Sequence, residues 1–161
     1  MKKDNCEIDN LDLEISSCFM KNAALPYTEV AKQLIVSGGT IHVRMKKLYD
    51  AGIIKGSQLV LDYSKLGYDI GAFVGIYLEK GSMYKYVAKE LAKIPEIVEI
   101  NYTTGAYSMF VKLVSKNTHN LREVLNEKIQ SIKGIERTET FIALEQSLSR
   151  QPELKPTKKK K

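Results

Sequence analysis

The spacing of apolar residues changes near residue 57 of this 161-residue chain. Before that point, apolar residues recur every three or four positions, which is typical of amphipathic helices. After residue 69, runs typical of strands alternate with two further helical stretches. We therefore expect an α+β chain with a helical domain at residues 1–56, a linker at 57–68, a mixed domain at 69–150 and a tail at 151–161.

Three short helices are expected in the helical domain. The first ends before Pro26, because proline cannot continue a helix. The second begins near Thr28, which suits either an N-cap or a first turn, and the third covers about residues 39–51. A glycine-containing turn joins the last two helices, with Ser37 available as a cap. This order predicts a helix-turn-helix of winged-helix-like character.

The mixed domain is expected to contain two helices and four strands. The strands are expected at residues 70–78, 97–103, 108–114 and 135–144. One helix precedes the second strand and the other precedes the fourth, which gives the order βαββαβ of a ferredoxin-like fold. A shift of 38 residues aligns the apolar positions of the two halves, for example Val87 with Leu125, and this supports the topology.

The formal net charge of +6 suggests a nucleic-acid partner, but the tail supplies most of it. Residues 151–161 hold five lysines and one glutamate, so we expect a disordered segment that either attracts DNA weakly or only aids solubility. No apolar run approaches the roughly 18 residues of a membrane span, and the chain does not open like a secretory signal. We therefore expect a cytoplasmic protein with no membrane partner.

Residues that carry catalysis or bind metals are not grouped in the sequence. The two cysteines and two histidines lack zinc-ligand spacing, and no nucleophile constellation or phosphate-binding glycine loop is visible. We therefore expect no metal, no cofactor and no enzymatic activity.

The third helix carries the candidate DNA-binding surface. At 100° per residue it buries Ile41, Met45 and Leu48 and turns its opposite face outward. In a helix-turn-helix, the first residues of this helix read base edges in the major groove, and later cations hold phosphates. The residues assigned to base contact are Gly39, Thr40, His42 and Val43.

Cations follow on the same helix. We expect Lys46 and Lys47 to face outward and contact phosphates, although a cluster like this can also be a solvated basic face. Arg44 lies near the edge of the apolar stripe, so it reaches either a phosphate or an acid such as Glu29. Two hydroxyl residues ahead of the helix complete the candidate set, Thr28 and Ser37.

Four stretches of the chain resemble the Lrp/AsnC family of transcription regulators, also called feast/famine regulatory proteins. They are residues 8–12, 29–34, 44–48 followed by 51–54, and 102–105, and the resemblance extends over about residues 8–148. It implies a helix-turn-helix that binds pseudo-palindromic operator DNA and a second domain that senses small molecules, commonly amino acids. It also implies homodimers in which two sheets pack together, octamers built from dimers, and effectors held between dimers.

The family loop usually reads Gly-Asp-Tyr-Asp, where this chain has Gly105-Ala106-Tyr107-Ser108. A carboxylate is the best partner for the amine of an amino acid, so the absence of both aspartates leaves a different ligand, or none, open. The loop is either a plain hairpin turn or part of an effector pocket. The residues expected to line such a pocket are Tyr102, Thr104, Gly105, Ala106, Tyr107, Ser108, Thr138 and Thr140.

Two other functions stay open from the sequence alone. Siroheme decarboxylases resemble the same two-domain arrangement and use the cleft for catalysis, but the basic third helix favours DNA. A protein that compacts DNA without sequence preference would use the same phosphate contacts. We expect a sequence-specific, homo-oligomeric transcription regulator.

Overall fold

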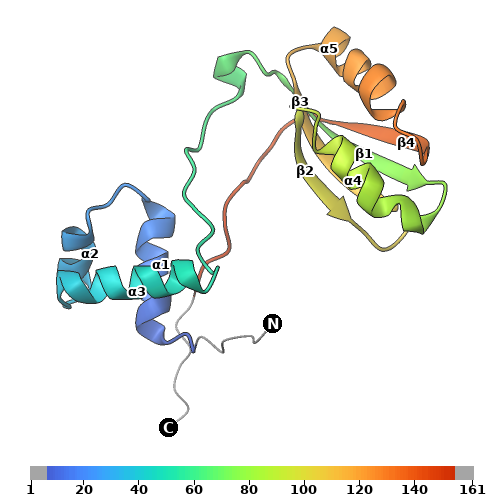
Figure 1. Ribbon diagram of the computed structural model, residues 1–161. Helices are drawn as coiled ribbons and strands as arrows, with labels where there is room; N and C mark the ends of the chain where they lie inside the picture. Colours follow the sequence, from blue (N-terminus) through green and yellow to red (C-terminus); the bar gives the residue numbers. More distant parts are fainter. Residues whose placement is uncertain (1–6, 155–161) are drawn as a thin grey trace. The chain divides into compact units, whose positions relative to one another are not determined.

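The computed structural model describes residues 7–154, and these form two units (Figure 1). The helical unit contains the described residues up to Leu59 together with those from Ser149 onward, and the mixed unit spans Val60–Leu148. The lysine-rich end of the expected tail, residues 155–161, lies outside the described residues. No helix within residues 7–154 is long and apolar enough to cross a membrane.

Three helices form the helical unit. They are α1 (Asn10–Lys21), α2 (Tyr27–Gln33) and α3 (Gly38–Asp50). Each contributes apolar side chains to a shared core, and the helical spacing in the sequence identified these positions. The most buried members of the core are Ile15, Val30, Ala31, Ile41 and Met45.

Local hydrogen bonds define where these helices begin. Asp9 and Asp12 form a reciprocal capping box at the start of α1. Ser37 accepts a hydrogen bond from a backbone N–H of the first turn of α3, so its predicted role as a cap is correct. Pro26 occupies the N-cap of α2 without a side-chain bond, which places Thr28 in the first turn and not at the cap.

The mixed unit contains four strands and two helices in the predicted order. They are β1 (Ile70–Leu78), α4 (Tyr84–Leu91), β2 (Ile97–Tyr102), β3 (Met109–Ser115), α5 (Thr118–Glu123) and β4 (Ile135–Ala143). All neighbouring strands pair antiparallel, in the order β2-β3-β1-β4. The ferredoxin-like fold is therefore confirmed.

The helix that precedes β4 changes its geometry along its length. After α5 the chain forms a π-helical segment, Val124–Ile129, and Gln130 N–H bonds to the carbonyl of Leu125, five residues earlier. Val124 and Ile129 are both fully buried. The wider turn brings two residues five apart onto the same face, where an α-helix would have presented Lys128 instead.

The two faces of the sheet differ in character. Val74 and Ile76 of β1 and Val111 of β3 are fully buried under α4 and α5, as strand alternation requires. The other face carries partly exposed aromatic rings, among them Phe73 and Phe110, which stack with ring centroids 5.8 Å apart. No helix of the mixed unit covers this second face within the described residues. We call it the open face.

Candidate DNA-binding surface and effector loop

Helix α3 presents two contrasting faces. Ile41, Met45 and Leu48 are buried against the helical core, as the sequence predicted. On the opposite face, Val43 is 70% exposed, and its neighbours Gly39, His42 and Lys46 are exposed as well. The outward face of α3 therefore combines an exposed valine with a lysine and a histidine.

Side-chain contacts hold the beginning of α3 in place. The Ser37 and Thr40 hydroxyl oxygens are 2.9 Å apart and share a hydrogen bond. The His42 ring packs against Tyr27 of α2, with centroids 4.5 Å apart. Thr40 is thus partly engaged within the protein, whereas His42 keeps an exposed edge. These contacts orient the first turn of α3, which is the part of a recognition helix that meets base edges.

Two cations of α3 bind acids of α1 instead of facing solvent. Arg44 Nη1 lies 2.6 Å from Asp9 Oδ2 and 2.9 Å from Asp12 Oδ1. Lys47 Nζ lies 2.8 Å from Asp12 Oδ2 and also donates to the carbonyl of Glu7. Of the two options left open for Arg44, the structure shows pairing with acids, but these are Asp9 and Asp12 and not Glu29. The expected outward orientation of Lys47 is wrong, because its ammonium turns toward Asp12. Both acids precede or begin α1, and they meet α3 only through tertiary packing.

Asp12 is a buried charge with two cationic partners. Its side chain is 0% exposed, whereas those of Arg44 and Lys47 are 26% and 36% exposed. Burial acts to raise the pKa of Asp12, but hydrogen bonds from Lys47 and Arg44 outweigh it and hold the pKa below its usual value. The hydrogen bond from Arg44 likewise lowers the pKa of Asp9. Both carboxylates thus stay ionised and fasten α3 to α1.

These lowered pKa values predict a loss of stability in acid. A carboxylate with a lower pKa in the folded than in the unfolded state contributes stability above the unfolded value, about 3.9 for Asp. We expect the free energy of unfolding to be level above about pH 5 and to fall as the pH drops through the lowered values. Urea unfolding followed by circular dichroism measures this. An Asp12→Asn variant with the same pH slope as the wild type would contradict it.

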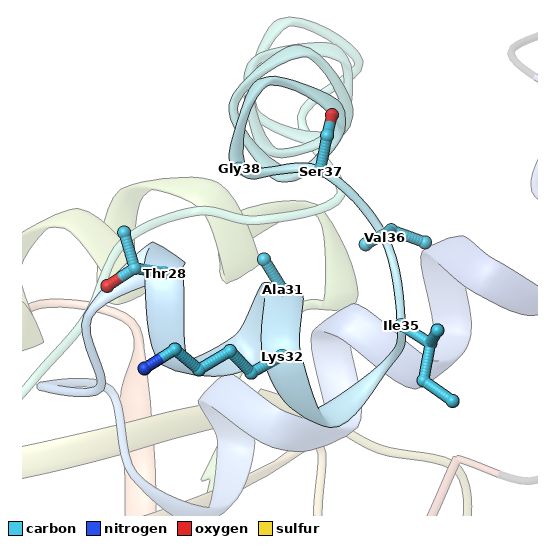
Figure 2. A pocket seen from close by; sticks show the side chains of 7 residues that line it. All are labelled: Thr28, Ala31, Lys32, Ile35, Val36, Ser37 and Gly38. Atoms are coloured by element: carbon cyan, nitrogen blue, oxygen red, sulfur yellow. The ribbon is translucent and has the colours of Figure 1, made fainter.

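A hollow of about 650 Å³ lies between α2 and the start of α3 (Figure 2). Thr28 and Lys32 project from α2 on one side, and Ser37 and Gly38 form the other side. Lys32 is exposed, and it is not among the DNA-binding residues predicted from the sequence. The Lys32 ammonium, the Thr28 and Ser37 hydroxyls and the N-terminus of α3 together are suited to bind a phosphate of the DNA backbone.

Ile35, in the turn between α2 and α3, has an unusual backbone conformation. Its φ is +55°, a left-handed value that β-branched residues rarely adopt, and its side chain is 92% exposed. Left-handed geometry costs an L-residue about 1–2 kcal/mol, and here little burial compensates for that cost. The side chain in Figure 2 points away from α2 at the edge of the hollow.

Replacing Ile35 with glycine is expected to stabilise the helical unit by about 0.5–1 kcal/mol. Glycine adopts positive φ without strain, although its greater freedom in the unfolded chain offsets part of the gain. Thermal unfolding of Ile35→Gly should shift upward, whereas Ile35→Ala, which keeps a Cβ, should gain less. A lower unfolding temperature for the glycine variant would show that the isoleucine side chain contributes to folding.

The loop between β2 and β3 is a short, hydrogen-bonded connection. Thr103 N–H donates to the Ser108 carbonyl, and its hydroxyl donates to the carbonyl of Tyr107. Gly105, at φ +107°, supplies the turn geometry. The Ser108 hydroxyl accepts a 3.4 Å hydrogen bond from the backbone N–H of Leu78, so it faces β1. These bonds end β2 at Tyr102 and start β3 after Ser108, each slightly inside the predicted limits.

The predicted effector residues do not gather in one place within a single chain. Thr104, Gly105 and Ala106 are exposed at the loop tip, and Tyr102 stacks on Tyr84. Tyr107 instead lies over Gly75 on the open face, where a Cβ on Gly75 would come within 2.5 Å of the ring.

Two further predicted residues belong to the opposite face. Thr138 and Thr140 of β4 pair directly with Ile76 and Val74, whose side chains face α4 and α5. They therefore lie across the sheet from Tyr107. A strand residue's face depends on register, and the prediction combined residues from two faces.

The structure gives Tyr107 an acidic partner. Its hydroxyl donates to Glu139 Oε2 at 2.8 Å, while Tyr77 and Arg137 bind Glu139 Oε1 at 3.2 and 2.9 Å. The hydrogen bond from Tyr107 lowers the pKa of Glu139, and the same bond raises the pKa of Tyr107. A carboxylate thus stands beside the loop that lacks both aspartates of the family pattern.

Comparison with known proteins decides the family. A model of the Lrp/AsnC ligand binding domain matches residues 71–153, and a winged helix-turn-helix DNA-binding model matches residues 8–55. The regulatory protein AsnC of Haemophilus influenzae is 44% identical over 149 residues, which cover 92% of this chain and 98% of that protein. The chain belongs to the Lrp/AsnC family.

Further relatives agree with this assignment. The solved structure of Escherichia coli AsnC matches this Lrp/AsnC chain with a TM-score of 0.85 at 42% identity, covering 91% of this chain and 99% of the other. The HTH-type transcriptional regulator FL11 of Pyrococcus furiosus is 39% identical over 85% of this chain and 89% of its own length. The protein is a DNA-binding transcription regulator with a ligand-binding domain, and the predicted family and function are confirmed.

Two residues of this Lrp/AsnC chain were missed by reasoning from sequence. Lys32 lies one helical turn after Thr28 on α2, so the four-residue spacing could have identified it. Glu139 alternates with Thr138 and Thr140 along β4, so the period of two could have placed it on the other face. Its partner Tyr107 lies 32 positions away, and no local pattern connects the two.

Proposed function

We propose that the protein recognises operator DNA through the outward face of α3. The observation that carries this proposal is the 70% exposure of Val43, directly opposite a fully buried apolar stripe. A valine in the major groove contacts a thymine methyl group, while His42 reaches a neighbouring base edge and Lys46 a phosphate. Thr28, Lys32 and Ser37 contact the backbone beside the hollow. Arg44 and Lys47 act by positioning α3 through Asp12.

The open face of the mixed unit is the surface for a second copy of the chain. Phe110 and Phe141 have ring centroids 6.4 Å apart there, and Phe141 remains 46% exposed. Packing two such faces would bury these rings and pair two recognition helices about one helical turn of DNA apart, roughly 34 Å. Sedimentation velocity tests this proposal, since a monomer at micromolar concentration would contradict it. Assembly of dimers into octamers follows the family pattern.

A small effector binds near the β2–β3 loop in this proposal. A transcriptional regulator from Neisseria meningitidis with a similar fold was solved as a complex with L-Met. In the present chain, Glu139 supplies the carboxylate that the loop itself lacks, at 2.8 Å from the Tyr107 hydroxyl. An amino acid could therefore meet a carboxylate here without the family aspartates. Loss of ligand binding in Glu139→Gln, with unchanged unfolding temperature, would support this site.

The relatives support a role in transcription regulation over siroheme decarboxylation or DNA compaction. We therefore propose that the protein is not an enzyme. We also propose that it acts in the cytoplasm. We also propose the limits 1–56, 57–68, 69–150 and 151–161 for the helical domain, linker, mixed domain and tail. The separate packing of the two units supports a similar division, with the mixed unit at Val60–Leu148.

Selection of random duplex DNA by the full-length chain at near-physiological salt tests specific recognition. Enrichment of an inverted repeat would support a specific regulator and supply its operator. Retention of DNA without sequence preference would favour compaction through phosphate contacts. No retention at all would contradict DNA recognition by α3.

A further inference from the structure

Helix α4 carries two lysines on the face that points away from the sheet. Val87 and Leu91 are fully buried in the core of the mixed unit. At 100° per residue, Lys85 and Lys89 lie on the opposite side of the helix, and both are exposed. They are four positions apart, which places them about 6 Å apart along the helix axis. We call this pair the lysine row.

The lysine row has no acidic partner among the described residues. Glu90, the one acidic residue of α4, instead binds Lys93 at 2.6 Å. Neither Lys85 nor Lys89 forms an ion pair within residues 7–154. Like charges four positions apart repel each other and weaken a helix. A bound anion would remove that repulsion, so the row is suited to a negatively charged partner.

Positive charge is concentrated in this part of the mixed unit. Residues 60–148 hold 11 lysines and arginines and 11 acidic residues, so the unit as a whole is neutral. Residues 80–93 hold four lysines and one glutamate, a local balance of +3, which leaves −3 for the rest of the unit. A polyanion is therefore attracted to the side of the unit that α4 forms and repelled by much of the remainder.

The lysine row remains accessible when two chains associate as proposed above. Helix α4 packs on the face of the sheet that carries Val74 and Ile76, whereas the open face with Phe73 and Phe110 lies on the other side. A second copy that covers the open face leaves α4 on the outside of the dimer. Each dimer then presents two such rows to solvent.

We propose that the lysine row binds the phosphate backbone of duplex DNA outside the operator. Lysine is depleted from protein–protein interfaces but is a common phosphate ligand, which favours DNA over an acidic protein. Tyr86, next to Lys85, is 46% exposed, and its hydroxyl can donate to a phosphate oxygen as well. A chain bound at its operator meets the flanking duplex at high local concentration, so weak contacts suffice. The row would lengthen the bound DNA without adding sequence preference.

Fluorescence anisotropy with a duplex of about 60 base pairs that lacks the operator tests the lysine row. The double variant Lys85→Gln/Lys89→Gln should bind this duplex at least tenfold more weakly at about 100 mM salt. The slope of log affinity against log salt should fall by about 1.8 for each bound row, because one phosphate contact contributes about 0.9. Both lysines are exposed, so the unfolding temperature and the sedimentation coefficient should equal those of the wild type.

Two controls separate the row from other contributions. Lys65→Gln/Arg122→Gln removes the same charge from exposed sites of the mixed unit outside α4, and should change the affinity less than threefold. A duplex of about 25 base pairs that holds only the selected operator accommodates two half-sites one turn apart. The double variant of the row should bind this short duplex as the wild type does.

Three results would overturn the proposal. They are an unchanged salt slope in Lys85→Gln/Lys89→Gln, an equal loss in the control variant, and an equal loss on the short operator duplex. The second would indicate an effect of total charge, and the third would remove the distinction between operator and flanking DNA. Failure of base recognition by α3 would leave the test intact, because the long duplex contains no operator.

Discussion

Replacing Val43 with aspartate is expected to weaken operator binding by about 100-fold. The side chain is 70% exposed on the outward face of α3, so the change should leave the fold intact. It removes the burial of an apolar side chain against a base, worth up to about 1.5–3 kcal/mol, and brings a negative charge toward the phosphates. A combined loss near 3 kcal/mol corresponds to a factor of about 100. Fluorescence anisotropy with the selected operator measures this.

Val60→Asp is the matched control for that experiment. Val60 is fully exposed and lies outside α3, so the same chemical change should alter operator affinity less than threefold. Thermal unfolding of both variants should equal that of the wild type within a few degrees. Equal affinities for Val43→Asp and the wild type would show that α3 does not enter the groove through this face.

Replacing Asp12 with alanine is expected to destabilise the helical unit by about 3 kcal/mol. The carboxylate is fully buried, and its removal leaves Arg44 and Lys47 without their shared partner. Breaking a buried ion pair costs about 3–5 kcal/mol, and the lower end applies because both cations still reach water and Arg44 keeps Asp9. Urea unfolding followed at 222 nm measures the change.

Asp50→Ala supplies the control for the loss of an aspartate. Asp50 is exposed in the last turn of α3, where a negative charge is unfavourable, so its removal should change stability by less than about 0.5 kcal/mol. If Asp12→Ala and Asp50→Ala had the same effect, the buried ion pairs would contribute nothing to joining α1 and α3.

The fold could be predicted far more completely than the site. Ser37, Pro26 and the regular apolar spacing act within a few residues, and local signals of this kind are visible in any sequence. The π-helical segment at Val124–Ile129 escaped prediction because the core selects it, through the burial of two residues five apart. The segment is short, but the cause of its geometry is nonlocal, because it depends on packing against the rest of the core.

By itself, the sequence determined the order of helices and strands, the Ser37 cap of α3, the buried stripe of α3 and the family. Each of these depends on residues close together along the chain, or on a pattern shared with relatives. Only the tertiary structure decided that Arg44 and Lys47 bind Asp12 and that Glu139 reaches Tyr107. Helical and strand periods place a side chain on a face of its own element. Which residue stands opposite depends on packing and register between elements distant in sequence.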